Sequence, residues 1–160
     1  MAKLKIRVFP DPDLRLKADK VISVGPAERE LLSDMALAMY LNQGVGLAAT
    51  QVGIRKSLVV IDVGDGLLKL VNPVITSKVG TQISEEGCLS VPGECIKIKR
   101  SKAVSVSFIN EAGEPSNIKG EGLLAKALQH ELDHLSGKLI IDYLNPIKKL
   151  LKRTKSCKKI

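Results

Sequence analysis

The sequence is poor in histidine, cysteine and aromatic residues, and it lacks any long apolar run. No stretch of 18 apolar residues occurs in the 160-residue chain, so we expect no membrane-spanning segment. Residues 1–17 mix charged and apolar side chains without an apolar signal-peptide core, which predicts a cytoplasmic protein. Three cysteines, an odd number in a chain without an export signal, favour free thiols or a thiolate used in chemistry.

Positive charge is concentrated at the end of the chain. Residues 146–160 carry seven of the eight net charges and no acid, so residues 1–145 are nearly neutral. This distribution argues against a uniformly basic nucleic-acid-binding fold and against a DNA partner. We expect one domain with a catalytic body, 1–145, and a basic C-terminal arm, 146–160. Ile147, Leu150 and Leu151 recur at helical spacing, which predicts that the arm is an amphipathic helix.

The order of the expected elements predicts an α+β fold. Segments with helical spacing lie towards both ends of the body, and the segments that read as strands lie between them. Two of these, 95–100 and 103–110, alternate with period two, as half-buried antiparallel strands do. A turn, "GDG", joins the first two strands. The expected helices are 24–44 and 122–137, and the expected strands are 57–63, 68–75, 95–100 and 103–110.

The only two histidines lie four residues apart in "QHELDH". On a helix this spacing places His130 and His134 on one face, with Glu131 beside them, which is typical of a metal site. Chance spacing is the alternative. The usual zinc protease sets do not fit, because the position of their third histidine is Ile140, and Asp142 is the only carboxylate after His134. A third ligand must therefore lie upstream.

A cysteine is the best candidate for the third ligand. Cys88 follows Gly87, which allows close approach of the backbone, and a turn comes soon after. Cys95 lies in an alternating strand, where we expect a buried structural thiol, and Cys157 lies in the basic tail. The sequence favours Cys88 without excluding Cys95. A set of one thiolate and two imidazoles leaves a fourth position open, as in catalytic sites, and suits zinc, iron or nickel.

Three motifs in order give the chain a family resemblance. Residues 44–51 "GVGLAATQ", 86–90 "EGCLS" and 129–134 "QHELDH" resemble the peptide deformylases, and the similarity reaches to about residue 150. The resemblance implies antiparallel or mixed sheets packed around a central metal-binding helix, with one helix near each end of the chain. It also implies a hydrolase that removes the N-formyl group from the formylmethionine of newly made polypeptides and releases formate.

The resemblance further implies the cofactor and the catalytic groups. The metal is expected to be Fe²⁺, with Zn²⁺, Ni²⁺ or Co²⁺ as substitutes. Glu131 would move the proton of the attacking water, while the Gln51 amide and the Leu89 backbone N–H would stabilise the developing oxyanion. A polar residue that merely closes a loop is the alternative for Gln51. The expected metal ligands are Cys88, His130 and His134.

The substrate pocket is expected between the first motif and the metal helix. Leu123 and Ala127 share nearly the same helix face as the histidines, although core packing would also explain them. Lys126 departs from the family, which is apolar at this position. Arg100 and Glu86 match the family and are expected to pair beside the site. The expected substrate-binding residues are Val45, Gly46, Gly87, Leu123, Lys126 and Ala127.

Three hypotheses about function and partners follow. The first is a deformylase acting on nascent formylated polypeptides and brought to the ribosome by its basic arm, for which a merely solvated helix is the alternative. The second is an unusual metallopeptidase that cuts internal bonds. The third is a structural metal module that docks on RNA, which requires a fourth protein ligand.

Overall fold

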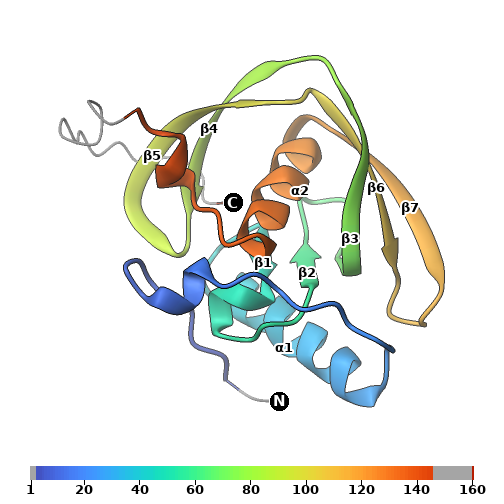
Figure 1. Ribbon diagram of the computed structural model, residues 1–160. Helices are drawn as coiled ribbons and strands as arrows, with labels where there is room; N and C mark the ends of the chain where they lie inside the picture. The colour runs from blue at the N-terminus through green and yellow to red at the C-terminus, as the bar shows by residue number, and fades with distance from the viewer. Residues whose placement is uncertain (1–2, 146–159) are drawn as a thin grey trace.

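The computed structural model describes residues 3–145 and residue 160. Residues 146–159, which make up nearly all of the expected helical arm, lie outside this described part. Within residues 3–145, no helix is both long and apolar enough to cross a membrane. Figure 1 shows one helix near the centre of the molecule with β-structure on both sides of it, and a second helix below. The α+β fold expected from the sequence is therefore confirmed.

Five strands form the larger sheet, in the order β1-β2-β3-β6-β7, and every neighbouring pair is antiparallel. The expected strands 57–63, 68–75 and 103–110 are confirmed as β2, β3 and β6. Two strands were missed because β1 has three residues and β7 is mostly polar, with Pro115 at its start. The bounds are Gly46–Ala48 (β1), Leu58–Ile61 (β2), Leu68–Val79 (β3), Ala103–Ile109 (β6) and Pro115–Glu121 (β7).

A two-stranded antiparallel hairpin forms the second sheet. It consists of β4, Gln82–Cys88, and β5, Val91–Arg100. Alternate residues of β4 point inwards, and two of them, Ser84 and Glu86, are polar and fully buried. That polar inner face explains why apolar periodicity did not reveal β4 in the sequence. The hairpin curves around the central helix in Figure 1, and its first strand ends at Cys88.

The central helix is α2, Gly122–Leu135. Its apolar face packs on the larger sheet: Leu128 is fully buried in one cluster with Val106 of β6 and Leu70 of β3. The chain turns at Gly137, where φ is +73° and a β-carbon would collide with the backbone of Arg15. Only glycine fits both conditions, so α2 ends where the sequence predicts.

The other helix, α1, spans Pro26–Leu41 and covers the lower side of the larger sheet (Figure 1). Proline at its first position suits a site where the N–H has no helical partner. Leu32, Met35 and Met39 of this helix are fully buried, with 0% exposure, in the core cluster that also contains residues of β1 and β2. Three short 3₁₀ turns complete the described part: Pro12–Arg15, Ala49–Val52 and Ile140–Tyr143.

Candidate metal centre

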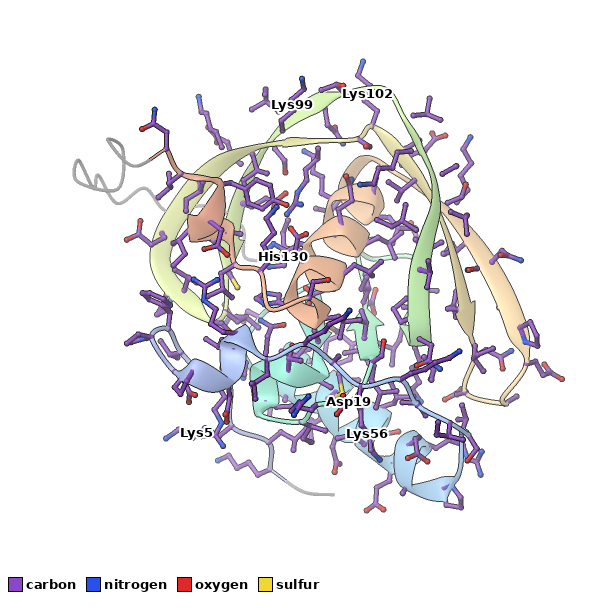
Figure 2. The ribbon with its side chains drawn as sticks, in the orientation of Figure 1. Lys5, Asp19, Lys56, Lys99, Lys102 and His130 are labelled. Carbon is purple, nitrogen blue, oxygen red and sulfur yellow. The ribbon has the colours of Figure 1, made fainter. Side chains whose placement is uncertain are left out.

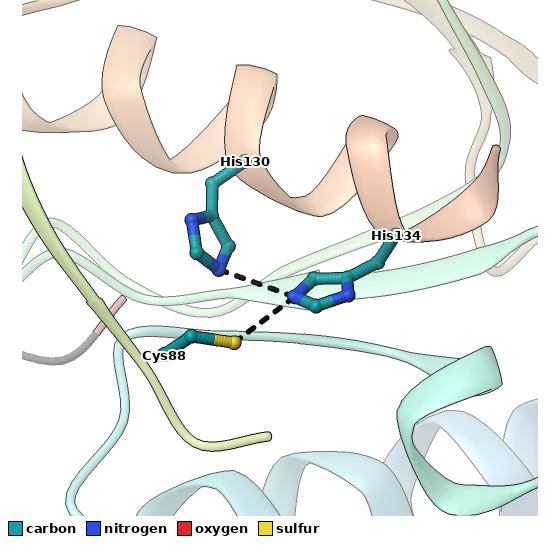
Figure 3. A group of neighbouring side chains, drawn as sticks. All are labelled: Cys88, His130 and His134. Carbon is teal, nitrogen blue, oxygen red and sulfur yellow. Dashed lines mark hydrogen bonds between the residues drawn. The ribbon is translucent and has the colours of Figure 1, made fainter. Parts of the chain in front are cut away.

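The structure brings together one sulfur and two imidazole nitrogens from distant parts of the chain. Helix α2 presents His130 and His134 on one face, and the end of β4 presents Cys88 opposite them (Figure 3). Cys88 Sγ lies 3.2 Å from His134 Nε2, which lies 3.2 Å from His130 Nε2. All three donor atoms lie within 4.8 Å of one another and all three residues are buried. The spacing suits one ion bound by three protein ligands.

A buried charge network holds His130 in this orientation. His130 Nδ1 lies 3.0 Å from Glu86 Oε2, so Nε2 points towards the other two donors. Arg100 donates to both oxygens of Glu86, at 2.8 and 2.9 Å, and to Asp133 Oδ2 at 2.7 Å. Tyr143 donates to the same Asp133 oxygen at 2.6 Å. Such support fixes the ring of a ligand histidine and raises its basicity.

The interior position of this network contrasts with the distribution of lysines. Figure 2 shows His130 in the middle of the molecule, whereas Lys99 and Lys102 extend outwards at the rim of the molecule. Arg100 differs from these two lysines, since its side chain is only 4% exposed and its charge is matched by two carboxylates. The Glu86–Arg100 pair expected from the sequence is therefore confirmed.

The pKa values of the buried groups around the triad are shifted in different directions. Burial alone would raise the pKa of Glu86, but Arg100 and His130 outweigh it and hold that pKa at about 2. Burial opposes a charge on His130, yet the Cys88 sulfur and the Glu86 carboxylate raise its pKa well above the usual 6.5. Burial lowers the pKa of His134 and keeps it neutral. The surroundings of His130 thus favour positive charge at this donor, whereas burial disfavours it at His134.

The expected oxyanion donors lie at the edge of the triad. Gln51 is fully buried, and its Oε1 accepts a hydrogen bond from the backbone N–H of Ala48 at 2.8 Å. That bond turns the amide nitrogen towards Cys88 Sγ, 3.8 Å away, and Ser90 Oγ, 3.2 Å away. Leu89 follows Cys88 directly and is 8% exposed. The Gln51 side chain is thereby fixed beside the Cys88 sulfur.

Glu131 is the most unusual polar residue of the site. Both of its carboxylate oxygens are buried, and neither has a hydrogen-bond partner within the described part of the chain. Burial raises the pKa of Glu131 to about 7. Its side chain packs against Gly46 of β1 so closely that a β-carbon there would lie 2.9 Å from Glu131 Cδ. An unpaired buried carboxylate is costly, which makes Glu131 a candidate functional group.

The expected substrate-binding residues lie around this centre with different degrees of burial. Ala127 is fully buried in an apolar cluster, and Val45 packs against the same cluster. Gly87, on β4, precedes the candidate ligand Cys88. Leu123 and Lys126 are half-buried in the first turns of α2. The structure therefore places Val45 and Ala127 together, while the parts of Leu123 and Lys126 in substrate binding stay predictions.

Cys95 differs from the sequence expectation. It is half-buried on β5 and disulfide-bonded, so the expected buried thiol is wrong. Cys88 is the cysteine with a free thiol in the described ranges. The geometry thereby resolves the choice between the two in favour of Cys88 as the residue facing the histidines.

A cavity of about 660 Å³ lies against another part of α2, where Gln129, Leu132 and Asp133 line it. None of the three candidate ligands borders it, so donor chemistry rather than cavity size locates the site.

Sequence reasoning missed Asp133 and Tyr143, which complete the support of Arg100. One signal was available for Asp133, because it lies three residues after His130 and thus on a neighbouring part of the helix surface. Tyr143 lies in a 3₁₀ turn that only the folded chain brings to β5.

Comparison with known proteins agrees with this geometry. The profile of the polypeptide deformylase family matches residues 3–150. A peptide deformylase of Thermoanaerobacter pseudethanolicus is 50% identical over 142 residues, 89% of each chain, and peptide deformylase 2 of Xanthomonas campestris is 45% identical over 164 residues, covering 99% of this chain and 96% of the relative. The peptide deformylase crystal structure from Legionella pneumophila superposes with a TM-score of 0.90 and 43% identity, covering 94% of this chain and 90% of the other. The chain belongs to the polypeptide deformylase family.

Proposed function

We infer that this protein removes the N-formyl group from the N-terminal formylmethionine of newly made polypeptides. Water is consumed, the C–N bond of the formamide breaks, and formate and a free amino terminus are released. The observation that carries this conclusion is the buried Cys88, His130 and His134 group in a chain of the deformylase family. Glu131, the residue after His130, has a buried carboxylate with no hydrogen-bond partner in the described part of the chain. Such a carboxylate suits the general base that a hydrolytic reaction uses.

One divalent metal ion fits the three donor atoms. Thiolate and imidazole ligands suit iron, zinc and nickel, and we propose Fe²⁺, with Zn²⁺, Ni²⁺ or Co²⁺ as substitutes. A bound divalent ion lowers the pKa of its water to about 7 and polarises a carbonyl oxygen. The Glu86 carboxylate would keep His130 aimed at the ion through Nδ1, 3.0 Å away.

Glu131 is proposed as the group that moves the proton. Its carboxylate follows a ligand on α2 but is turned towards Gly46, so it can face the water without binding the ion. It would accept the proton of the attacking water and deliver it to the departing amine. Its burial and the absence of a hydrogen-bond partner among residues 3–145 and 160 leave both oxygens available for these two transfers.

Gln51 and Leu89 are proposed as donors to the negative charge that develops on the formyl oxygen. The bond from the Ala48 N–H fixes the Gln51 amide, so its N–H groups need no reorganisation during the reaction. Losing one donor of this kind costs about 10²–10³ in turnover. The Leu89 N–H would act from the turn between β4 and β5.

The methionine side chain is proposed to enter the apolar space between β1 and the first half of α2. Val45 and Ala127 belong to the same apolar cluster there. Leu123 and the stem of Lys126 would extend it, with the ammonium reaching water. Gly46 and Gly87 would let the peptide backbone come close.

The basic arm, residues 146–160, is proposed to bring residues 1–145, the catalytic body of the same domain, to the ribosome. Its seven lysines and arginines would be attracted to RNA phosphates in a salt-dependent way. The proposal also places the enzyme in the cytoplasm, where its substrate emerges.

A substrate comparison with a base-free variant tests this function. Protein purified without oxygen is expected to release formate from formyl-Met-Ala-Ser and to leave the peptide bonds of N-acetyl-Met-Ala-Ser intact. Glu131→Gln is expected to retain the metal but lose about 10²–10⁴ in turnover. Glu85→Gln, on the exposed face of β4, is the matched control and should behave as the parent. Cleavage of internal bonds without formate release would instead indicate a metallopeptidase.

A further inference from the structure

The side chain of Gln129 ties helix α2 to the link between β5 and β6. Strand β5 ends at Arg100 and β6 begins at Ala103, so Ser101 lies in the short link between them. Gln129 is buried, and its amide binds both backbone groups of Ser101. Its Oε1 accepts from the Ser101 N–H at 3.0 Å, and its Nε2 donates to the Ser101 carbonyl at 3.1 Å. These two hydrogen bonds form a clamp on the backbone of Ser101.

Two side chains of α2 hold consecutive residues of this link. Gln129 binds Ser101, and Asp133, which lies four residues later and thus on the same side of the helix, accepts a hydrogen bond from the Arg100 guanidinium at 2.7 Å. The two candidate histidine ligands are each the next residue along the chain, so they form the neighbouring row of the helix surface. One row of α2 therefore presents metal ligands, while the adjacent row fixes the end of β5.

These contacts close a ring that includes the side chain of His130. Its Nδ1 lies 3.0 Å from Glu86 Oε2, and Glu86 accepts two hydrogen bonds from Arg100. The backbone leads from Arg100 to Ser101, and the clamp returns from there to Gln129, the residue directly before His130. A shift of Arg100 relative to α2 would carry Glu86 away from the imidazole, and the clamp opposes that shift.

We propose that Gln129 is a positioning residue for the metal centre, which acts on the His130 ring through this chain of contacts. The inference rests on the ligand set of the proposed function, because it concerns how one ligand is aimed at the ion. Groups that orient a ligand histidine typically contribute about 10- to 100-fold to metal affinity. Gln129 acts through Arg100 and Glu86 rather than on the ring itself, so we expect the lower end of this range, about tenfold.

Metal affinity of the Gln129→Met protein tests this role. Methionine keeps an unbranched side chain of similar length but cannot form the clamp. Asn72→Gly is the matched control, because the Asn72 amide clamps the N–H and carbonyl of Val21 in the same way, at 2.9 and 2.8 Å. Glycine also tolerates the φ of +50° at this position. Both variants therefore lose one backbone clamp, but only Gln129→Met loses the one that leads to His130.

The full-length proteins are stripped of metal, and their affinity for Zn²⁺ is measured by competition with a chromophoric chelator. We expect Gln129→Met to weaken Zn²⁺ binding about tenfold and Asn72→Gly to keep the parent affinity. The visible absorption of Co²⁺-loaded protein, which reports the geometry of the ligands, should change in Gln129→Met and stay as in the parent in Asn72→Gly. If Gln129→Met does not fold, Gln129→Asn, whose amide is one methylene shorter, takes its place in both measurements.

A double variant shows whether the effect passes through Glu86. Glu86→Gln replaces the carboxylate that pairs with Arg100 by a neutral amide. In this background, Gln129→Met should weaken Zn²⁺ binding by less than it does in the parent, because changes within one hydrogen-bonded network are not additive.

Three results would overturn the inference. The first is a Gln129→Met protein with the parent's Zn²⁺ affinity and Co²⁺ spectrum, which would make the clamp a purely structural contact. The second is an equal loss of affinity in Asn72→Gly, and the third is full additivity of Gln129→Met with Glu86→Gln. Formate release from formyl-Met-Ala-Ser is measured separately on the parent. A parent protein that binds Zn²⁺ as expected but releases no formate with any of the proposed metals refutes the proposed function and leaves this inference standing, whereas a parent that binds no metal ion refutes both.

Discussion

Gly46→Ala offers a sharp test of how the structure positions Glu131. The added β-carbon would lie 2.9 Å from Glu131 Cδ and 3.0 Å from Cγ, whereas ordinary contacts begin near 3.4 Å. The backbone at Gly46 has no positive φ, so alanine causes no local strain there. The Glu131 carboxylate must instead move by at least about 0.5 Å, which reaches the limit of tolerance for a productive catalytic geometry.

That displacement sets the size of the expected effect. A misplacement of about 1 Å at a reacting group costs on the order of 10²-fold in rate, so we expect Gly46→Ala to lower kcat between about 10- and 100-fold. Metal content should stay at the parent level, because the three atoms nearest to the new methyl group all belong to Glu131 and none to a candidate ligand. Gly25→Ala, at the start of α1 and away from the site, is the control and should keep the parent kcat.

A double variant shows whether the effect passes through Glu131. Formate release is measured for the parent, for Gly46→Ala, for Glu131→Gln and for the pair, at saturating formyl-Met-Ala-Ser. In the Glu131→Gln background, Gly46→Ala should cost little further, since two changes that act on one group are not additive. Full additivity, or a Gly46→Ala effect confined to KM, would refute the reasoning and make Gly46 a substrate contact only.

Three further predictions concern the ligand, its support and the arm. Cys88→Ser should lose most bound metal in an elemental analysis while Cys95→Ser retains it, and the reverse result would reassign the ligand. Glu86→Gln should lower the free energy of unfolding of metal-free protein in urea by roughly 3 kcal/mol, because the pKa of Glu86 is held at about 2 against an ordinary 4.5. The difference in unfolding free energy should be full above pH 4.5 and disappear as the pH falls through 2. A difference that persists at pH 2 would exclude the ion pair with Arg100 as its source. Truncation after Asn145 should weaken salt-dependent cosedimentation with ribosomes and leave kcat on formyl-Met-Ala-Ser unchanged. If the truncated and full-length proteins cosediment equally, the arm does not bring the enzyme to the ribosome.

Local patterns were enough to predict the metal helix. The spacing of His130 and His134 fixes their common face once the segment is helical, and Gly137 ends α2 as expected. Helical periodicity also predicted α1. Period-two alternation predicted β6 and the second half of β5, and β2 and β3 were expected on either side of the "GDG" turn. These features depend on residues close together in the sequence, so the sequence alone could reveal them.

Features that depend on distant contacts were not predictable in the same way. Strand β4 carries the buried polar residues Ser84 and Glu86, whose inward position makes sense only with Arg100 and His130 around them. The disulfide at Cys95 and the burial of Ile160 likewise require the folded chain. A basic, lysine-rich tail predicts a solvated segment, and nothing local indicates that its last side chain lies in the apolar cluster beside the metal helix.

A metal titration tests the central claim most directly. Protein stripped of metal by a chelator is titrated with Fe²⁺ without oxygen, and formate release from formyl-Met-Ala-Ser is measured at each step. A single ion held by Cys88, His130 and His134 predicts that activity rises from near zero and stops rising at one equivalent per chain, with no rise in His134→Ala. Full turnover in the stripped parent, or an unchanged titration of His134→Ala, would contradict the account.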